Sequence, residues 1–217
     1  MPLWALIPIK PLSRGKSRLA ELMSDKEREF LNQKLLIRTI NCLIAVPLID
    51  QIAVISHDPA ALHVSREFGV MTIQETRNID INNALRKATQ AIQASNASQL
   101  LIIPADLPLV LPEDITELLS KSKGIEEIII SPDRRMSGTN ALFINPIGIL
   151  DYDYEQWSFQ KHIEQAERKK IHVEIYNNDR IAFDLDLPED LEYLRNNNLL
   201  EEINIQIDSD YKWRINE

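Results

Sequence analysis

The chain has 217 residues, a formal net charge of −9 and an apolar fraction of 44%, which allows one large globular domain. Its apolar stretches are short and broken by Pro, Asp or Lys, which predicts no transmembrane helix, and its first residues show no signal-peptide pattern. We therefore expect a cytoplasmic protein without a membrane partner, and the acidic balance argues against a nucleic-acid partner. The single cysteine, Cys42, excludes an internal disulfide and a cysteine metal cluster.

The predicted elements alternate short apolar strands with amphipathic helices, which is typical of an α/β fold with a mostly parallel sheet covered on both faces. The expected strands are 4–9, 52–56, 71–73, 100–103, 128–130, 141–144 and 173–175. Helix-start signals, either a polar cap or a proline at the first helical position, stand at Ser24, Asp58, Asp80, Pro112 and Pro188. Glu27 completes a capping box with Ser24, and Gly69 ends the second helix.

The absence of a long linker predicts one domain over residues 1–198, followed by a tail of uncertain structure over 199–217. Apolar and polar residues alternate over 203–207, as in a half-buried strand. Such a strand can pair with the sheet edge or with a second copy of the chain, which leaves a homodimer open. A loosely ordered terminus is the alternative.

Charge is distributed unevenly along the sequence. Residues 1–38 carry eight lysines or arginines against four acids, whereas residues 184–217 carry ten acids against three bases. A local basic loop opposite a distant acidic cluster suits a metal-bound polyphosphate ligand. For the last acids of the sequence, a solvated face is the simpler interpretation.

A basic loop directly follows the first predicted strand. Because parallel strands end at the edge where open α/β folds bind ligands, Lys10, Lys16 and Arg18 are expected to hold phosphate oxygens. The alternative is a solvated loop before a helix. Gly15 is the only glycine between residues 10 and 18, so the loop is neither a Walker P-loop nor a dinucleotide-binding turn. Cationic side chains, more than backbone amides, must hold the phosphates.

Two acidic segments are candidates for metal binding. A buried strand stops at Pro104 and places Asp106 at the carboxyl edge of the sheet, where it either binds Mg²⁺ or caps a turn. Asp184 and Asp186 stand two residues apart on an extended segment, so their side chains point the same way and can share a metal. Asp186 has a competing role as the cap of the helix that begins at Pro188.

Four groups of motifs together resemble one family. They are Pro8-Ile-Lys10-Pro with Lys16-Ser-Arg-Leu19, Pro104-Ala-Asp106-Leu-Pro108, Ser131-Pro-Asp133-Arg with Gly138-Thr-Asn-Ala-Leu142, and Asp184-Leu-Asp186-Leu-Pro188-Glu-Asp190, in this order over about residues 3–195. They look like the guanylyltransferases of coenzyme F420 biosynthesis. The resemblance implies a three-layer nucleotidyltransferase fold, like that of nucleotide-diphospho-sugar transferases, with a mostly parallel mixed sheet.

The resemblance also implies a reaction, in which GMP passes from GTP to a small phosphorylated three-carbon acid and pyrophosphate leaves. In the family the acid is 2-phospho-L-lactate, phosphoenolpyruvate or 3-phosphoglycerate. In-line transfer needs positioning and charge neutralisation and no covalent nucleophile. Lys10, Lys16 and Arg18 would hold the triphosphate, and catalytic roles fall to Lys16 and Asp106. The residues expected to bind one or two Mg²⁺ ions are Asp106, Asp184 and Asp186.

The resemblance also points to a base site at Asn82, because residues 80–85 match a family segment with an asparagine before the helix, and an amide there can read a purine edge with both a donor and an acceptor. A plain N-terminal cap is the alternative. Among the histidines, His57 ends a strand and can line the cleft, while none shows metal-ligand spacing with another. His162 stands four residues after Ser158 on one helical face and can support the acceptor site, although a packed histidine with satisfied hydrogen bonds is the simpler expectation.

The family's acceptor contacts fall on Thr139 and Ser158. This sequence departs from the family pattern nearby: Glu155 and Trp157 stand where small residues, often glycine, are usual, and Met136 replaces a glycine. A carboxylate repels an anionic acceptor and an indole occupies space. These changes leave the identity of the acceptor open.

Two other functions remain as alternatives. In a nucleotide-sugar glycosyltransferase, Asp184 and Asp186 would form the metal-binding Asp-x-Asp pair, but here the pair comes late and runs directly into a helix. A nucleotide-binding module without turnover is the second alternative. The presence of both Asp106 and Asp186 argues against it.

Overall fold

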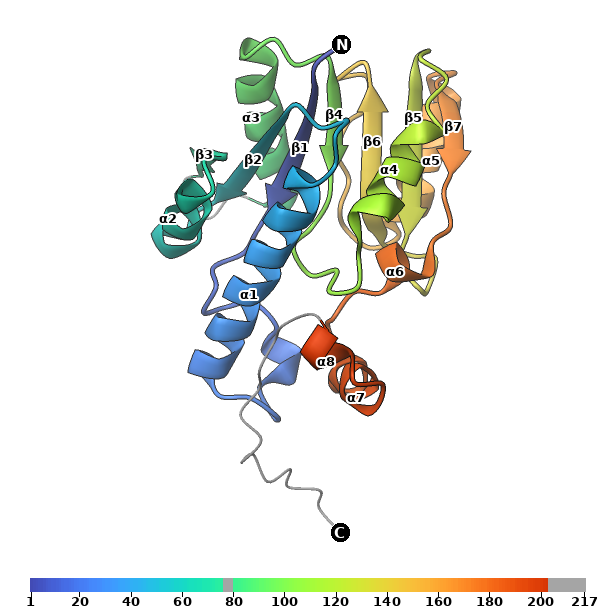
Figure 1. Cartoon of the computed structure of the whole chain (residues 1–217). Helices are drawn as coiled ribbons and strands as arrows, with labels where there is room; N and C mark the ends of the chain where they lie inside the picture. Colours follow the sequence, from blue (N-terminus) through green and yellow to red (C-terminus); the bar gives the residue numbers. More distant parts are fainter. Residues whose placement is uncertain (76–79, 203–217) are drawn as a thin grey trace.

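The computed structural model of the protein describes residues 1–75 and 80–202. Within these ranges, seven strands form a single sheet in the order β3-β2-β1-β4-β6-β5-β7 (Figure 1). The strands are β1 Leu3–Pro8, β2 Gln51–Ser56, β3 Met71–Gln74, β4 Gln99–Ile102, β5 Glu127–Pro132, β6 Thr139–Asn145 and β7 His172–Ile175. Each coincides with a predicted strand, shifted or extended by up to two residues at its ends.

Only β6 runs against its neighbours in the sheet. It pairs antiparallel with both β4 and β5, whereas every other neighbouring pair is parallel. The predicted fold class, a mostly parallel mixed sheet, is confirmed. Parallel strands carry their carboxyl ends to the same edge, so the segments after β1, β2, β3 and β4 lie side by side.

Helices cover both faces of the sheet. The helices of the described ranges are α1 Asp25–Ile44, α2 Pro59–Glu67, α3 Ile81–Ala94, α4 Pro112–Ser120, α5 Ser158–Arg168, α6 Asp179–Ala182, α7 Pro188–Asn196, α8 Leu199–Glu202 and the short 3₁₀-helix η1 Ser17–Leu19. In Figure 1, α1 and α4 lie in front of the sheet, α3 and α5 lie behind it, and α7 and α8 lie below it. None of these helices is long and apolar enough to span a bilayer.

The strands are buried on both sides, as a three-layer fold requires. In β1, Ala5 and Ile7 pack with α1, α2 and α4, while Trp4 and Leu6 pack with α3 and α5. This explains why the strands appear in the sequence as nearly continuous apolar runs. Cys42 belongs to the core on the side of the sheet that α1 and α4 cover, where burial raises the pKa of its thiol to about 12.

The predicted helix caps are confirmed, with one informative exception. Ser24 and Glu27 form the capping box of α1, and Asp80 accepts the Asn83 amide at the start of α3. At α7 the N-cap position is Leu187, and Asp190 in the first turn accepts on its Oδ2 the backbone amides of Asp186 at 2.9 Å and Leu187 at 2.7 Å. Asp186 therefore does not cap α7, and its carboxylate is left for other contacts.

A third apolar cluster lies below the carboxyl edge of the sheet and joins distant parts of the chain. This closing cluster consists of Leu19, Met23, Leu31, Leu35, Phe183, Leu185, Leu191 and Leu194. Leu19 follows the basic loop and Leu185 lies between the two acids of the second acidic segment, and both are fully buried. Apolar packing thus brings the two charged segments together.

Helix α8 begins the tail that was predicted to have uncertain structure. Leu199 and Leu200 pack against the closing cluster, so this first turn of the tail is joined to the domain. The alternating segment 203–207, predicted as a half-buried strand, lies outside the described residues.

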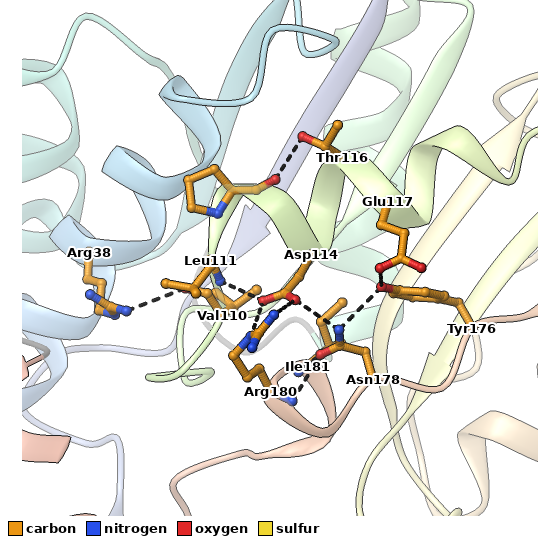
Figure 2. Close-up of polar contacts among 11 residues, drawn as sticks. Arg38, Val110, Leu111, Asp114, Thr116, Glu117, Tyr176, Asn178, Arg180 and Ile181 are labelled. Atoms are coloured by element: carbon orange, nitrogen blue, oxygen red, sulfur yellow. Dashed lines mark hydrogen bonds and ion pairs between the residues drawn. The ribbon is translucent and has the colours of Figure 1, made fainter.

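A polar network fastens the segment after β7 to α4 (Figure 2). Its centre is Asp114, which is 1% exposed and accepts hydrogen bonds from Arg180 Nε at 2.7 Å, Asn178 Nδ2 at 2.9 Å and the Leu111 amide at 2.9 Å. Beside it, Tyr176 donates its hydroxyl to Glu117. The network fixes where the chain turns toward the acidic segment 184–186.

Arg180→Ala is expected to lower the free energy of unfolding by about 1–3 kcal/mol, because it leaves Asp114 buried with fewer donors. The Arg180 side chain is 48% exposed, which keeps the loss below that of a fully buried ion pair. Urea unfolding measures it. The control is Arg168→Ala, at an exposed position, expected within about 0.5 kcal/mol of wild type. Equal losses in the two variants would contradict the expectation.

The contact between Arg180 and Asp114 also makes the free energy of unfolding depend on pH. Burial acts to raise the pKa of Asp114, but hydrogen bonds from Arg180, Leu111 and Asn178 outweigh it and hold the pKa below its ordinary value. The stabilisation is therefore complete above the unfolded-state pKa of about 3.9 and is lost as the pH falls through the folded-state value. The difference between wild type and Arg180→Ala should shrink below about pH 4.

Candidate functional site

A cleft of about 360 Å³ opens at the carboxyl ends of β1, β2, β3 and β4. Four of its lining side chains are charged residues that the sequence analysis singled out: Lys10, Lys16, Asp106 and Asp186. The other lining residues include His57, at the end of β2, and Glu75, at the end of β3. The predicted position of the site, at the carboxyl edge after the first strand, therefore coincides with a cleft.

Lys16 lies between the two predicted metal ligands. Its Nζ donates to Asp106 Oδ2 at 3.0 Å and to Asp186 Oδ1 at 2.9 Å, and its side chain is 6% exposed. Burial acts to lower the pKa of Lys16, but the two carboxylates outweigh it and raise the pKa above its ordinary value. Lys16 is thus joined to a carboxylate that lies 170 residues further along the chain.

The basic loop is braced so that Lys16 reaches this position. The Leu12 amide donates to Asp58 Oδ2 at 2.8 Å, and Asn32 Nδ2 of α1 donates to the Leu12 carbonyl at 2.7 Å. A Cβ at Gly15 would lie 2.5 Å from Asn32 Nδ2, so this close approach requires glycine. Lys16 itself has a left-handed backbone, with φ 56°, which is strained for a residue with a side chain.

The other two cations of the loop remain accessible. Lys10 is exposed and lines the cleft, and Arg18 is exposed on η1. Burial acts to raise the pKa of Asp186, but the positive charges of the loop outweigh it and hold the pKa below its ordinary value. Lys16 has the largest effect of the three cations, followed by Arg18 and then Lys10. Both exposed cations are therefore close enough to act on the acidic side of the site.

Asp184 occupies a different environment from its two predicted partners. It does not line the cleft, and its pKa is raised to about 6 by burial, with the neighbouring charge of Asp106 the next cause. In the described residues, no three His, Cys, Asp or Glu side chains gather as a potential metal group. Asp106 and Asp186 form a two-carboxylate set, which fits Mg²⁺ because that ion is usually bound by one or two carboxylates together with phosphate oxygens and water.

Asn82, the residue predicted to read the base, stands between two residues of α3 that line the cleft, Ile81 and Ala84. It is buried at the start of α3, where its Oδ1 accepts the Tyr154 amide at 2.7 Å, and it does not line the cleft. Its acceptor is therefore already engaged. Nor is Asn82 the helix cap, because that position belongs to Asp80. In the structure, Asn82 ties the loop before α5 to α3.

Thr139 and Ser158 meet in one buried hydrogen-bond chain. Ser158 Oγ donates to Thr139 Oγ1 at 3.2 Å, and Thr139 Oγ1 lies 3.1 Å from His162 Nδ1. His162 Nε2 accepts the Asp153 amide at 3.2 Å, and burial lowers the pKa of His162 to about 4, so the ring is neutral at pH 7. The expectation of a packed histidine with satisfied hydrogen bonds is confirmed. The ring also supports both predicted acceptor residues.

The departures from the family pattern sit at special backbone positions. Met136 has φ 56° and Trp157 has φ 63°, in the left-handed region that favours glycine. Glycine would adopt this backbone without strain, whereas Met136 and Trp157 do so with a side chain. Both side chains are largely exposed, Met136 to 44% and Trp157 to 61%. Glu155 is also exposed, and its Oε2 lies 4.0 Å from Lys161 Nζ.

Glu75 is a cleft residue that the sequence analysis missed. Its Oε1 lies 3.2 Å from Nδ1 of His57, which was expected to line the cleft and does so. Its position in the sequence was the signal that could have identified it. Glu75 directly follows the strand 71–74, so it lies at the same edge of the sheet as Lys10 and Asp106.

Comparisons with known proteins agree on family and fold. A family model described as "Guanylyl transferase CofC like" matches residues 3–198. A phosphoenolpyruvate guanylyltransferase from Rubrobacter xylanophilus is 35% identical over 191 residues, covering 88% of this chain and 92% of that protein. A 2-phospho-L-lactate guanylyltransferase from Methanocaldococcus vulcanius is 34% identical over 187 residues, covering 86% and 81% respectively.

Solved structures show the same fold at low sequence identity. A nucleotidyl transferase from Methanothermobacter thermautotroptrophicus has a TM-score of 0.64 at 12% identity, covering 92% of this chain and 99% of that one. A protein from Desulfovibrio desulfuricans G20, whose proposed class is nucleotide-diphospho-sugar transferase, has a TM-score of 0.70 at 15% identity and covers 96% and 100%. The predicted nucleotidyltransferase fold is confirmed.

Proposed function

Because the chain belongs to the guanylyl transferase CofC-like family, we propose that it transfers GMP from GTP to a small phosphorylated three-carbon acid, in coenzyme F420 biosynthesis. The contact of Lys16 with both Asp106 and Asp186 carries the proposal from the structural side. It assembles a cation and a two-carboxylate set in one cleft, as a nucleotidyltransferase that handles a metal-bound triphosphate requires.

In the reaction, a phosphate oxygen of the acceptor forms a bond to the α-phosphorus of GTP. The bond from that phosphorus to the β,γ-pyrophosphate breaks, and the leaving group takes the electron pair. The main tasks of the protein are to align the reactants and to neutralise charge on the oxygens. Lys10, Lys16 and Arg18 are the cations of the basic loop for these oxygens, and Arg18 can contact two oxygens at once.

Asp106 and Asp186 are the residues that would hold Mg²⁺. A bound Mg²⁺ polarises the α-phosphate and shields its charge from the incoming anion. Lys16 bonds the same two carboxylates, so its ammonium and a divalent cation compete for their oxygens. Asp184 adds negative charge beside this pair and stays in the proposal as a further ligand when two metal ions bind.

For the acceptor we propose the region of Thr139 and Ser158. Ser158 begins α5, whose N-terminus has no side-chain cap and favours an anion, although the Phe159 amide already donates to the Ser137 carbonyl at 3.2 Å. The hydrogen bonds to Thr139, and through it to neutral His162, hold the Ser158 hydroxyl in place. The relatives are named for phosphoenolpyruvate and for 2-phospho-L-lactate, so both acids, with 3-phosphoglycerate, are the acceptors to test.

Pyrophosphate release tests the proposal. Purified protein with GTP and Mg²⁺ is offered each of the three acids separately, and release is expected with at least one of them and not without acceptor. Chromatography should show the matching guanylylated acid. Tight GTP binding with no release in any mixture would favour a binding module, and release with a sugar phosphate alone would favour another transferase of this fold.

A further inference from the structure

The cleft continues from the phosphate side toward the edge of the sheet. In the strand order β3-β2-β1-β4, Glu75 follows β3, His57 follows β2 and Asp106 follows β4. Neighbouring strands lie about 4.8 Å apart, so the ends of β3 and β4 are separated by roughly 14 Å. A nucleotide with its α-phosphate near Asp106 can therefore extend its base along the cleft toward Glu75.

The walls of this part of the cleft are apolar. Ile55 at the end of β2, with Ile81 and Ala84 in the first turns of α3, line it. Ile81 is 38% exposed although it is a large apolar side chain. Flat apolar walls suit a purine ring, because both faces of the ring lose contact with water when they pack against side chains.

Glu75 supplies the polar group of this region. Its side chain is 11% exposed, and its Oε1 contacts His57 Nδ1 at 3.2 Å. Its Oε2 is shielded from water and has no hydrogen-bond partner among the described residues. A buried carboxylate oxygen without a donor is energetically unfavourable. Donors from a ligand would remove that cost.

We propose that Glu75 selects guanine, by turning its carboxylate toward the cleft and accepting the N1–H and the N2 amino group of the base on its two oxygens. Guanine carries these two donors side by side, which matches two carboxylate oxygens. Adenine has a ring-nitrogen acceptor in place of the first donor, so the carboxylate disfavours it. His57 is the positioning residue that holds Oε1. The inference rests on the proposed function, since it concerns the base of the same nucleotide.

Glu75→Gln is the variant that tests it, with direct titration of GTP, inosine triphosphate and xanthosine triphosphate in the absence of acceptor. Inosine lacks the N2 amino group, and xanthosine has an oxygen there. Wild type should bind GTP at least about tenfold tighter than the inosine nucleotide. In Glu75→Gln, GTP and inosine triphosphate should bind with about equal affinity. Xanthosine triphosphate should bind more tightly than it does to wild type, because the glutamine amide donates to its O2.

Controls separate the inference from the proposed function. Glu67→Gln, at an exposed glutamate of α2, should keep the wild-type nucleotide preference. If Glu75→Gln does not fold, Glu75→Asp serves, since a carboxylate withdrawn by one methylene should weaken GTP binding without a gain for xanthosine triphosphate. Unchanged discrimination in a folded Glu75 variant, with wild type still active, overturns the inference alone. If wild type binds GTP but turns over none of the three acids, the proposed reaction is overturned. The nucleotide titrations then still test whether Glu75 selects the base.

Discussion

Asp106→Asn is expected to lower kcat/KM for guanylyl transfer by about a thousandfold or more, since a carboxylate that holds a metal at a transferring phosphate supplies several kcal/mol. Asparagine has nearly the same shape, and Lys16 keeps its contact with Asp186, so the variant should still fold. Pyrophosphate release over a range of Mg²⁺ concentrations measures the effect.

The matched control for this variant is Asp179→Asn, at an exposed aspartate of α6. It removes the same charge from the protein and should leave both turnover and thermal unfolding near the wild-type values. Full activity of Asp106→Asn would remove Asp106 from the metal site. Loss of activity together with unfolding would instead assign it a structural role through Lys16.

Lys16→Ala is expected to abolish turnover nearly completely, with a loss of about a thousandfold or more, because a preorganised charge near the transferred phosphoryl group is lost. The structure adds a second expectation with the opposite sign. Without the ammonium, Asp106 and Asp186 have no shared cation, so they should bind a divalent metal more tightly. A gain of about tenfold corresponds to 1.4 kcal/mol.

Mn²⁺ binding in the absence of nucleotide measures this second effect independently of turnover. Lys10→Ala is the matched control, because Lys10 is an exposed cation of the same cleft that contacts neither carboxylate. Its effect on Mn²⁺ affinity should be much smaller. Unchanged or weaker Mn²⁺ binding by folded Lys16→Ala would show that the two carboxylates are not the metal-binding pair.

Local signals in the sequence were sufficient for the strands and for the helices α1, α2, α3, α4 and α7. Buried strands appear as apolar runs, and caps such as Ser24 with Glu27 involve residues close in the chain, so their effects do not depend on the tertiary fold. The cap of α7 was less certain because Asp186 and Asp190 can both reach the helix start. In the structure Asp190 accepts the backbone amides there, which leaves Asp186 for Lys16.

The site was only partly predictable. Lys16, Asp106 and Asp186 were identified from charge and position, but their mutual contact depends on packing between segments 90 and 170 residues apart. Asn82 was given a base-reading role because amides suit it chemically, yet its oxygen is engaged by Tyr154. Glu75 carries no distinctive motif. Its importance appears only when strand order places it beside the cleft and leaves one oxygen without a donor.

The closing cluster also sets an order of events during protein synthesis. Leu19 and the basic loop leave the ribosome early, whereas Leu185, Leu191 and Leu194, which complete the cluster, are added much later. Until then the loop has no second carboxylate, and of the closing cluster only Met23, Leu31 and Leu35 are present to pack against Leu19.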